Sequence, residues 1–282
     1  MAERIDIGID GGGSGCRVVA SLGDRHARAE GGPANVATDP AAAEAAIRET
    51  LLSALRSFSL GLEDLDGARI VAGLAGCRLP GIADQFAMRL PFLAYVVDDS
   101  VTALEGAFGG GHGTLVNLGT GAFFIRKDAR GVTHHGGWGL VLGDEGSAGW
   151  LGREALRQLM TIEDGSRAAL QDDPLRPALW AALGGRHPVA FAAKARPEDF
   201  AALAPLVFEF DSPWADLLRD RIVAIVTEGL HNVGHPEGTP WALTGGLGQR
   251  LAERLTGAQA QGLQATQGTA LDGALSMARA LP

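Results

Sequence analysis

The sequence predicts an α/β fold built from two related halves, each with a sheet flanked by helices. Residues 4–30 contain a strand, a glycine turn, a second strand, a polar turn and a short third strand, and residues 112–137 repeat this order. In the first half, helix and strand signals then alternate, and parallel neighbours in a sheet require such helical crossovers. The recurrence of one pattern at the start of each half indicates an internal repeat.

The first half begins with a predicted β-hairpin. Residues 4–9 (RIDIGI) alternate polar and apolar side chains, residues 16–22 (CRVVASL) form a second apolar run, and GGGSG supplies the turn between them. A helix should follow at TDPAAAEAAIRETLLSALRSF, with Thr38 or Asp39 as its cap and Pro40 in its first turn. The remaining predicted elements of this half are strands at 25–30, 69–76 and 92–98 and helices at 80–89 and 100–108.

The second half begins at HGTLVNLGTGAFFIRKDARGVTHHGG (112–137), where LVNLGTGAFFI resembles IGIDGGGSGCRVV of the first hairpin. A buried strand is predicted at PWALTGG (240–246), followed by two short helices. GGGHG (109–113) is the expected linker between the halves. The other predicted elements are helices at 146–160, 175–184, 198–208 and 213–233.

Composition favours a soluble protein that binds a small molecule. The 282 residues suffice for one large domain or two ordinary ones, and Cys16 and Cys77 have no metal-binding spacing, so we expect a reducing compartment, the cytoplasm. No segment approaches the ~18 to 20 apolar residues of a membrane span, and the first residues lack the features of a signal peptide. A net charge of -9 without a basic cluster argues against nucleic acid as a partner.

The two glycine turns suggest phosphate binding. In DGGGSG (10–15), glycines let backbone N–H groups converge on an anion, the hydroxyl adds a donor, and the acid can hold a metal ion or its water shell. The alternative is a hairpin turn that needs glycine only for positive φ. The second turn, GTG (119–121), favours phosphate binding, although the chain contains neither GxxxxGK[ST] nor GxGxxG spacing.

Asp98 and Asp99 end a predicted strand beside the first turn. Adjacent strand residues point to opposite faces, so at most one of them can face a given site. A carboxylate there could accept the proton of a hydroxyl that attacks a γ-phosphoryl group, or it could cap the next helix. His231 and His235 have the spacing of a zinc pair, but the HNVGH segment lacks the HExxH pattern.

Six segments together resemble the N-acetylglucosamine and glucosamine kinases of the BadF/BadG/BcrA/BcrD ATPase family. In order, they are GIDGGGS (8–14), GGPANV (31–36), VDDSVTALEGAFG (97–109), NLGTG (117–121), GGWGLVLGDEGSAGWLG (136–152) and LTGGLG (243–248). They span nearly the whole chain, and the GWGxxxGDEGS block is the most specific of them.

The resemblance implies the actin-like ATPase fold of sugar kinases, with two RNase H-like domains around a nucleotide- and sugar-binding cleft. It implies ATP and Mg²⁺ as cofactors, an amino sugar as substrate, and a homodimer. It also implies that the final helix returns to the first domain. We therefore expect an N-terminal domain of residues 1–110 plus 267–282 and a C-terminal domain of residues 111–266.

The resemblance also implies roles for individual residues. Asp99 matches the catalytic base, which also binds the substrate, and Asp10 matches the acid beside the Mg²⁺ ion and the phosphates. Matches to sugar-binding positions are Asn35, Gly137, Trp138, Gly139 and Asp144. The neighbouring Glu145 is expected either near the sugar or at the start of the next helix. Matches to ATP-binding positions are Gly12, Gly13, Ser14, Gly119, Thr120, Gly121, Gly245 and Gly246.

Some features leave alternatives open. LAPLVFEFDSP (203–213) has bulky residues where relatives often have small ones near the adenine, and the sequence does not decide between glucosamine and N-acetylglucosamine. An iron–sulfur activator ATPase would need a cysteine pair that Cys16 and Cys77 do not form. The third interpretation is a sugar-sensing protein of the same fold. The presence of Asp10, Asp99 and Thr120 together argues against it, because these residues indicate an active site.

Overall fold

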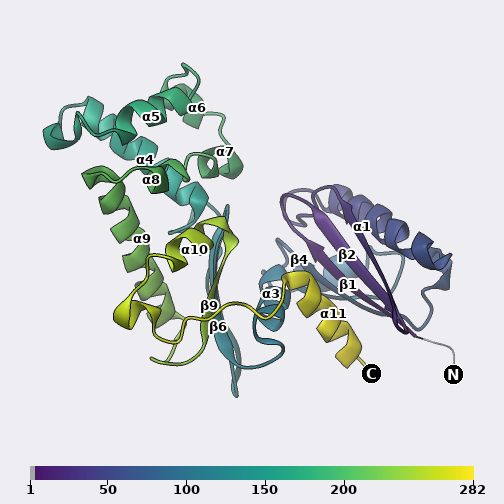
Figure 1. Ribbon diagram of the computed structural model, residues 1–282. Coiled ribbons are helices and arrows are strands. Elements are labelled where there is room, and N and C mark those ends of the chain that lie inside the picture. Colours follow the sequence, from purple (N-terminus) through teal and green to yellow (C-terminus); the bar gives the residue numbers. More distant parts are fainter. Residues whose placement is uncertain (1–3) are drawn as a thin grey trace. The chain divides into compact units, whose positions relative to one another are not determined.

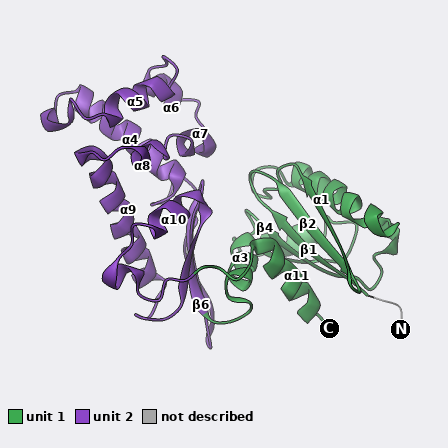
Figure 2. Ribbon diagram, in the orientation of Figure 1, with its two compact units in different colours: residues 1–112, 265–282 green, residues 113–264 purple. Residues whose placement is uncertain are grey.

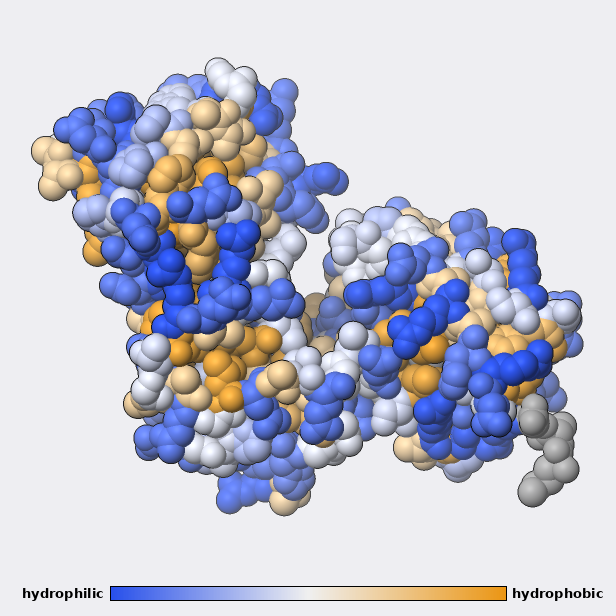
Figure 3. All heavy atoms as spheres, viewed as in Figure 1, coloured by the Kyte–Doolittle hydropathy of each residue, from blue (hydrophilic) through white to orange (hydrophobic). Residues whose placement is uncertain are grey.

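The structure, a computed structural model, describes residues 4–282 and divides the chain into two compact units (Figures 1 and 2). Unit 1 comprises residues 1–112 and 265–282, and unit 2 comprises residues 113–264. The expected boundaries lay at 110 and 267, two residues from each of these divisions. Polar residues cover much of the visible face of each unit, with hydrophobic patches among them (Figure 3).

Unit 1 is built on a five-stranded mixed sheet in the order β3-β2-β1-β4-β5. β1 and β2 form the predicted antiparallel hairpin, β3 extends it, and β4 and β5 add parallel strands on the other side of β1. The strands are β1 (Ile5–Gly11), β2 (Cys16–Leu22), β3 (Arg25–Gly31), β4 (Arg69–Leu74) and β5 (Tyr95–Asp98). β5 is shorter than the predicted 92–98, because the chain becomes extended only at Tyr95.

Helices cover both faces of this sheet (Figure 1). The helices of unit 1 are α1 (Pro40–Leu55), α2 (Ile82–Ala87), α3 (Asp99–Phe108) and α11 (Ala270–Ala280), with 3₁₀ turns η1 (Arg56–Phe58) and η2 (Leu62–Asp64). The cap of α1 is Asp39, whose carboxylate accepts hydrogen bonds from the N–H groups of Ala41 and Ala42 at 3.0 Å. Ile47 and Leu51 of α1 are fully buried in the core on one face of the sheet.

α3 and α11 lie on the opposite face and approach each other closely. A side-chain carbon at Gly106 of α3 would lie 1.9 Å from the carbonyl oxygen of Thr269, and one at Gly273 of α11 would lie 2.0 Å from that of Thr102. Glycine at both positions lets the two helix backbones touch. This contact fixes the start of α3, and therefore Asp99, relative to the sheet.

Unit 2 repeats the strand order with a four-stranded sheet, β8-β7-β6-β9, which confirms the predicted internal repeat. β6, β7 and β8 are antiparallel neighbours and β9 pairs with β6 in parallel. The strands are β6 (Gly113–Leu118), β7 (Ala122–Asp128), β8 (Gly131–Gly136) and β9 (Trp241–Thr244). Its helices and turns are α4 (Ala148–Glu163), η3 (Ala168–Leu170), α5 (Leu175–Ala182), α6 (Pro188–Ala192), α7 (Pro197–Ala201), α8 (Leu206–Glu209), α9 (Pro213–Asn232), α10 (Gly245–Ala252) and η4 (Gly257–Ala260).

The single helix predicted over 198–208 is wrong. The chain forms α7 and α8 instead, and the residues between them make a series of turns. Pro205 has no N–H to continue a helix and stands just before α8, so it separates the two helices. The short helix α6 was not predicted. Within residues 4–282 no helix is long and apolar enough to cross a membrane.

Candidate active site

Two predicted site acids, Asp10 and Asp99, meet at one edge of the sheet of unit 1. β1, β4 and β5 are parallel, and their register aligns Gly11 with Leu74 and Leu74 with Asp98. The carboxyl ends of these strands therefore lie side by side. Asp10, one residue before the end of β1, is only 6% exposed, and its charge acts on Asp99.

The adjacent acids Asp98 and Asp99 have different surroundings. Asp98 is the cap of α3, because its carboxylate accepts hydrogen bonds from the N–H and the hydroxyl of Ser100. Asp99 is the first residue of the helix itself. The helix-cap alternative therefore applies to Asp98, and Asp99 is the candidate for the proton-accepting base.

Burial and two neighbouring carboxylates perturb Asp99. Burial raises the pKa of Asp99 from its usual 3.8 to about 7, with further increases from the charges of Asp98 and Asp10. Burial also raises the pKa of Asp10, and the guanidinium of Arg17 opposes this rise. A carboxyl group with a pKa near neutrality is suited to accept a proton at physiological pH.

The glycine turn of unit 1 presents an open surface. The N–H of Gly12 donates to the carbonyl of Gly15 at 2.9 Å, which closes the turn. None of Gly12, Gly13 and Gly15 has positive φ, so the interpretation of these glycines as conformational necessities is wrong. A side-chain carbon at Gly13 would meet nothing within 4 Å, and the exposed Ser14 follows it. Glycine here keeps space free beside the backbone.

Backbone hydrogen bonds attach the Asn35 loop to this turn. The N–H of Ala34 donates to the carbonyl of Gly12, and that of Val36 to the carbonyl of Ala75, both at 2.9 Å. The side-chain oxygen of Asn35 accepts from the N–H groups of Ala37 and Thr38 at 3.0 and 3.2 Å. Unit 1 thus brings together the predicted residues Asp10, Gly12, Gly13, Ser14, Asn35 and Asp99.

The second glycine turn, Gly119–Gly121, lies between β6 and β7 of unit 2. Two N–H groups from the start of α4, those of Ala148 and Gly149, donate to the carbonyls of Gly119 and Thr120. Gly245, the first residue of α10, packs against the same turn with φ of 81°. A side-chain carbon at Gly245 would lie 2.4 Å from the carbonyl of Leu118, so the position requires glycine for both space and conformation.

A cavity of about 340 Å³ opens beside this turn. Its wall contains the predicted residues Gly119, Thr120 and Gly246. The rest of the wall is formed by Ala148, Ala201, Ala204, Pro205, Leu247 and Arg250. From the segment 203–213, Ala204 and Pro205 line this cavity, while the bulkier Val207 is fully buried in the core.

Arg250 is a residue of this cavity that sequence reasoning missed. It lies on α10, five residues after Gly245, and is exposed. Its guanidinium brings positive charge to a cavity that is otherwise lined by small and apolar residues. The segment LTGGLGQR indicates this position, because Arg250 follows Gly246 by one helical turn and therefore lies on the same side of α10.

The loop from Gly136 to Ser147 carries the remaining predicted residues. Gly137 and Gly139 have φ of 74° and 80°, so backbone conformation requires glycine there. Asp144 also has positive φ, 57°, and is 8% exposed. Its carboxylate accepts a hydrogen bond from the N–H of Gly139 at 3.2 Å, while burial raises its pKa. Trp138 is 56% exposed.

Asp144 also touches the second glycine turn. A side-chain carbon at Gly121 would lie 2.7 Å from a carboxylate oxygen of Asp144, and the backbone N–H of Ala122 hydrogen-bonds to that carboxylate. Asp144 and the exposed Glu145 line a polar cavity of about 330 Å³. Its other polar side chains, which sequence reasoning missed, are His135, Arg221, Glu228 and Asn232.

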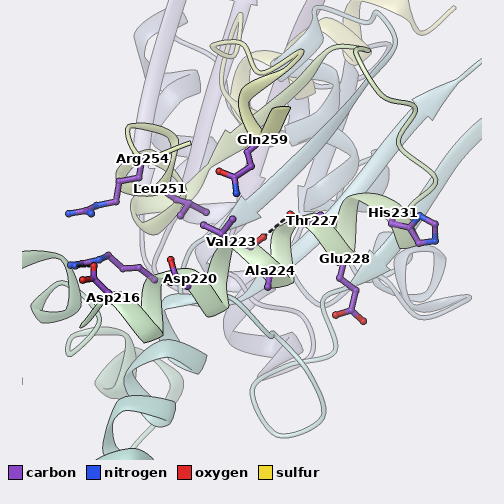
Figure 4. A pocket seen from close by; sticks show the side chains of 11 residues that line it. Asp216, Asp220, Val223, Ala224, Thr227, Glu228, His231, Leu251, Arg254 and Gln259 are labelled. Atoms are coloured by element: carbon purple, nitrogen blue, oxygen red, sulfur yellow. Dashed lines mark hydrogen bonds and ion pairs between the residues drawn. The ribbon is translucent and has the colours of Figure 1, made fainter. Parts of the chain in front are cut away.

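A larger groove, of about 850 Å³, runs along α9 but contains none of the predicted residues (Figure 4). Two of its polar side chains bond to nearby backbone carbonyls. The Thr227 hydroxyl donates to the carbonyl of Val223 at 2.9 Å, and the buried Arg219 donates to the carbonyls of Val207 and Phe210. Arg219 therefore joins α9 to the segment around α8, which is a structural role.

Three proteins illustrate what the chain is similar to. A candidate N-acetylglucosamine kinase from Chromobacterium violaceum has a crystal structure that aligns with a TM-score of 0.88 and 32% identity, covering 99% of this chain and 100% of that one. The glucosamine kinase GspK of Vibrio cholerae is 25% identical over 96% of this chain and 95% of its own length. The N-acetyl-D-glucosamine kinase of Dictyostelium discoideum is 28% identical over 83% and 79%.

These similarities confirm the predicted α/β class with two domains of the sugar kinase type. The model of the BadF/BadG/BcrA/BcrD ATPase family matches residues 7–224, which is more than half of the chain. The chain belongs to the BadF/BadG/BcrA/BcrD ATPase family.

Proposed function

We propose that this protein is an ATP-dependent amino-sugar kinase that phosphorylates the 6-hydroxyl of glucosamine or N-acetylglucosamine. The observation that carries the proposal is Asp99, the first residue of α3 directly after β5, whose pKa is raised to about 7 by burial and by the charges of Asp98 and Asp10. The names of the similar proteins support an amino sugar as the acceptor. They include both sugars, so the proposal keeps both.

Asp99 acts as the general base in the proposed reaction. Its carboxylate accepts the proton of the sugar hydroxyl while the hydroxyl oxygen forms a bond to the γ-phosphorus of ATP. The bond between the γ-phosphorus and the bridging oxygen breaks, and ADP leaves with that electron pair. The products are a sugar phosphate, ADP and a proton.

Asp10 fits a magnesium ion that is held partly by nucleotide. Mg²⁺ is usually bound by one or two carboxylates together with substrate phosphates and waters. Among residues 4–282, no three or more His, Cys, Asp or Glu side chains are grouped so that they could hold a metal ion by themselves. Asp10 instead supplies one carboxylate at a strand end, next to the glycine turn. Bound there, Mg²⁺ would neutralise phosphate charge.

The remaining assignments stay predictions that the geometry supports. Phosphate binding is assigned to Gly12, Gly13, Ser14, Gly119, Thr120 and Gly121, and contact with the adenosine to Gly245 and Gly246. Sugar binding is assigned to Asn35, Gly137, Trp138, Gly139, Asp144 and Glu145. A homodimer likewise stays a prediction from the family resemblance, and a cytoplasmic location stays a prediction from the spacing of Cys16 and Cys77.

The iron–sulfur alternative is disfavoured by the state of both thiols. Cys16 and Cys77 are buried, and burial raises their pKa values to about 11 and about 12. Cluster ligation requires accessible thiolates, so neither side chain is suited to it.

Replacing Asp144 by asparagine should raise the KM for the sugar about tenfold or more and leave the KM for ATP within a few-fold. The proposed hydrogen bonds from sugar hydroxyls to a charged carboxylate would be weakened. Asparagine is chosen because it tolerates the positive φ of this position, whereas alanine would add backbone strain. Initial rates at varied sugar and varied ATP provide the measurement.

The matched control is Glu163→Gln, which removes a surface carboxylate of unit 2 that pairs with Arg176. Its two KM values should equal those of the wild type. An equal rise of both KM values in Asp144→Asn would instead show that Asp144 only maintains the loop.

The raised pKa of Asp99 makes a stability prediction for the protein in EDTA without nucleotide. Between pH 3.8 and about 7, the unfolded chain ionises this carboxyl while the folded protein keeps it protonated. The unfolded state then binds fewer protons, so this group's contribution to stability falls as pH rises through that window. Asp99→Asn has no ionisable group at this position, so it does not lose this stability as pH rises.

The melting temperature of Asp99→Asn should therefore match the wild type near pH 4 and exceed it by several degrees at pH 8. Thermal unfolding followed by circular dichroism at both pH values is the measurement. A difference that is the same at the two pH values would contradict the perturbed ionisation of Asp99.

A coupled ADP-release assay tests the proposed function. Wild-type protein with MgATP is offered glucose, glucosamine, N-acetylglucosamine and N-acetylmuramic acid. We expect glucosamine or N-acetylglucosamine to give the highest kcat/KM. Saturable sugar binding without ADP release would instead favour a sugar-sensing protein.

A further inference from the structure

Asp10 and Arg17 form an ion pair at the base of the first glycine turn. They lie directly opposite each other in the register of β1 and β2, one pair before the turn begins. A nitrogen of Arg17 lies 2.7 Å from a carboxylate oxygen of Asp10. Residues directly opposite in an antiparallel pair project to the same face, so both side chains belong to the face that carries α3 and Asp99.

The two partners of this pair differ in their access to solvent. The side chain of Asp10 is 8% exposed, whereas that of Arg17 is 57% exposed. The carboxylate is therefore fixed within the site, and the long arginine side chain is the partner that can move. The structural interpretation, a surface ion pair that only stabilises the hairpin, would be worth little, because half-exposed pairs contribute weakly to stability.

This inference rests on the proposed function, in which the carboxylate of Asp10 also binds Mg²⁺. Mg²⁺ and the Arg17 guanidinium both require the carboxylate oxygens of Asp10. A guanidinium that is displaced from Asp10 stays within reach of the Gly12–Gly15 turn, since Arg17 is only two residues beyond it. Its planar donors suit phosphate oxygens.

We propose that Arg17 is a nucleotide-binding residue that pairs with Asp10 in the nucleotide-free protein and binds the ATP polyphosphate when Mg²⁺ occupies Asp10. In the free protein the pair keeps the buried carboxylate neutralised. In the complex the same guanidinium adds positive charge beside the phosphates, where the reaction redistributes negative charge. Arg17 thus has an anionic partner in both states, Asp10 in one and the polyphosphate in the other.

The test uses Arg17→Gln and two measurements that need no turnover. Mn²⁺ binding to nucleotide-free protein is followed by electron paramagnetic resonance, and MgADP binding is followed by calorimetry. Arg17→Gln should bind Mn²⁺ several-fold more tightly than the wild type, because the competitor for Asp10 is gone. It should bind MgADP about ten- to a hundredfold more weakly, because phosphate donors are lost.

Controls separate this role from a structural one. Arg28→Gln removes an arginine of the neighbouring strand β3 that pairs with Asp272 and is 66% exposed, and it should change neither affinity. Arg17→Lys keeps a charge but loses the planar fork, so its MgADP affinity should fall between wild type and Arg17→Gln. Thermal unfolding checks that each variant is folded.

Opposite shifts of the Mn²⁺ and MgADP affinities support the proposal. Unchanged MgADP affinity in a folded Arg17→Gln variant overturns it while leaving the kinase proposal intact. If wild-type protein itself binds no MgADP, the proposed function fails and this inference fails with it.

Discussion

Replacing Asp99 by asparagine is expected to lower kcat by about 10²- to 10⁴-fold, the usual contribution of a general base. Asparagine keeps the size of the side chain but cannot accept the proton of the attacking hydroxyl. The KM values for sugar and ATP should change much less than kcat. Single-turnover and steady-state rates of sugar phosphorylation, measured at saturating MgATP, check this expectation.

The adjacent acid provides the matched control. Asp98→Asn preserves the cap of α3, because asparagine is as good a helix cap as aspartate. Its kcat should stay within a few-fold of the wild type. Wild-type turnover by Asp99→Asn, or an equal loss in both variants, would remove Asp99 from its proposed role.

Replacing Asp10 by asparagine is expected to lower kcat/KM for MgATP by about a hundredfold or more, because a charged ligand of the ion beside the phosphates is lost. The Mg²⁺ concentration needed for half-maximal rate should rise in parallel. Initial rates over a Mg²⁺ titration at fixed ATP provide the measurement.

Asp6→Asn serves as the control for this loss. Asp6 lies on the same strand, is buried and pairs with an arginine, Arg69, at 2.6 Å. Losing that pair should reduce thermal stability without moving the Mg²⁺ titration. If Asp6→Asn and Asp10→Asn shifted the titration equally, the effect would be one of strand stability and not of a metal site.

The sequence was sufficient for the order of elements because local signals and the fold agree there. The hairpin of 4–22 and the helix capped by Asp39 are formed where predicted. The repeat at 112–137 correctly predicted a second sheet of the same strand order. The single helix predicted over 198–208 is wrong because Pro205 cannot continue a helix and begins a new short one, α8.

The reasons for individual glycines could not be predicted in the same way. The φ angles of Gly12 and Gly13 contradict the conformational explanation, whereas Gly137 and Gly139, predicted only as sugar contacts, are required by their positive φ. Backbone conformation depends on loop geometry that residue type alone does not specify.

The missed residues depend on contacts between distant parts of the chain. Arg17 is opposite Asp10 only because the turn between β1 and β2 sets that register. Arg250 reaches the cavity beside Thr120 only because α10 packs on the second glycine turn. Both arginines follow a recognised glycine segment, but their contacts become visible only once the fold is known.

The most direct test of the central claim is the identity of the reaction product. Wild-type protein is incubated with MgATP and either glucosamine or N-acetylglucosamine, and the mixture is followed by ³¹P and ¹H nuclear magnetic resonance. The proposal predicts one sugar 6-phosphate for each ADP formed, with no product in Asp99→Asn over the same time. ADP with inorganic phosphate and no sugar phosphate, or phosphate on another hydroxyl, would contradict it.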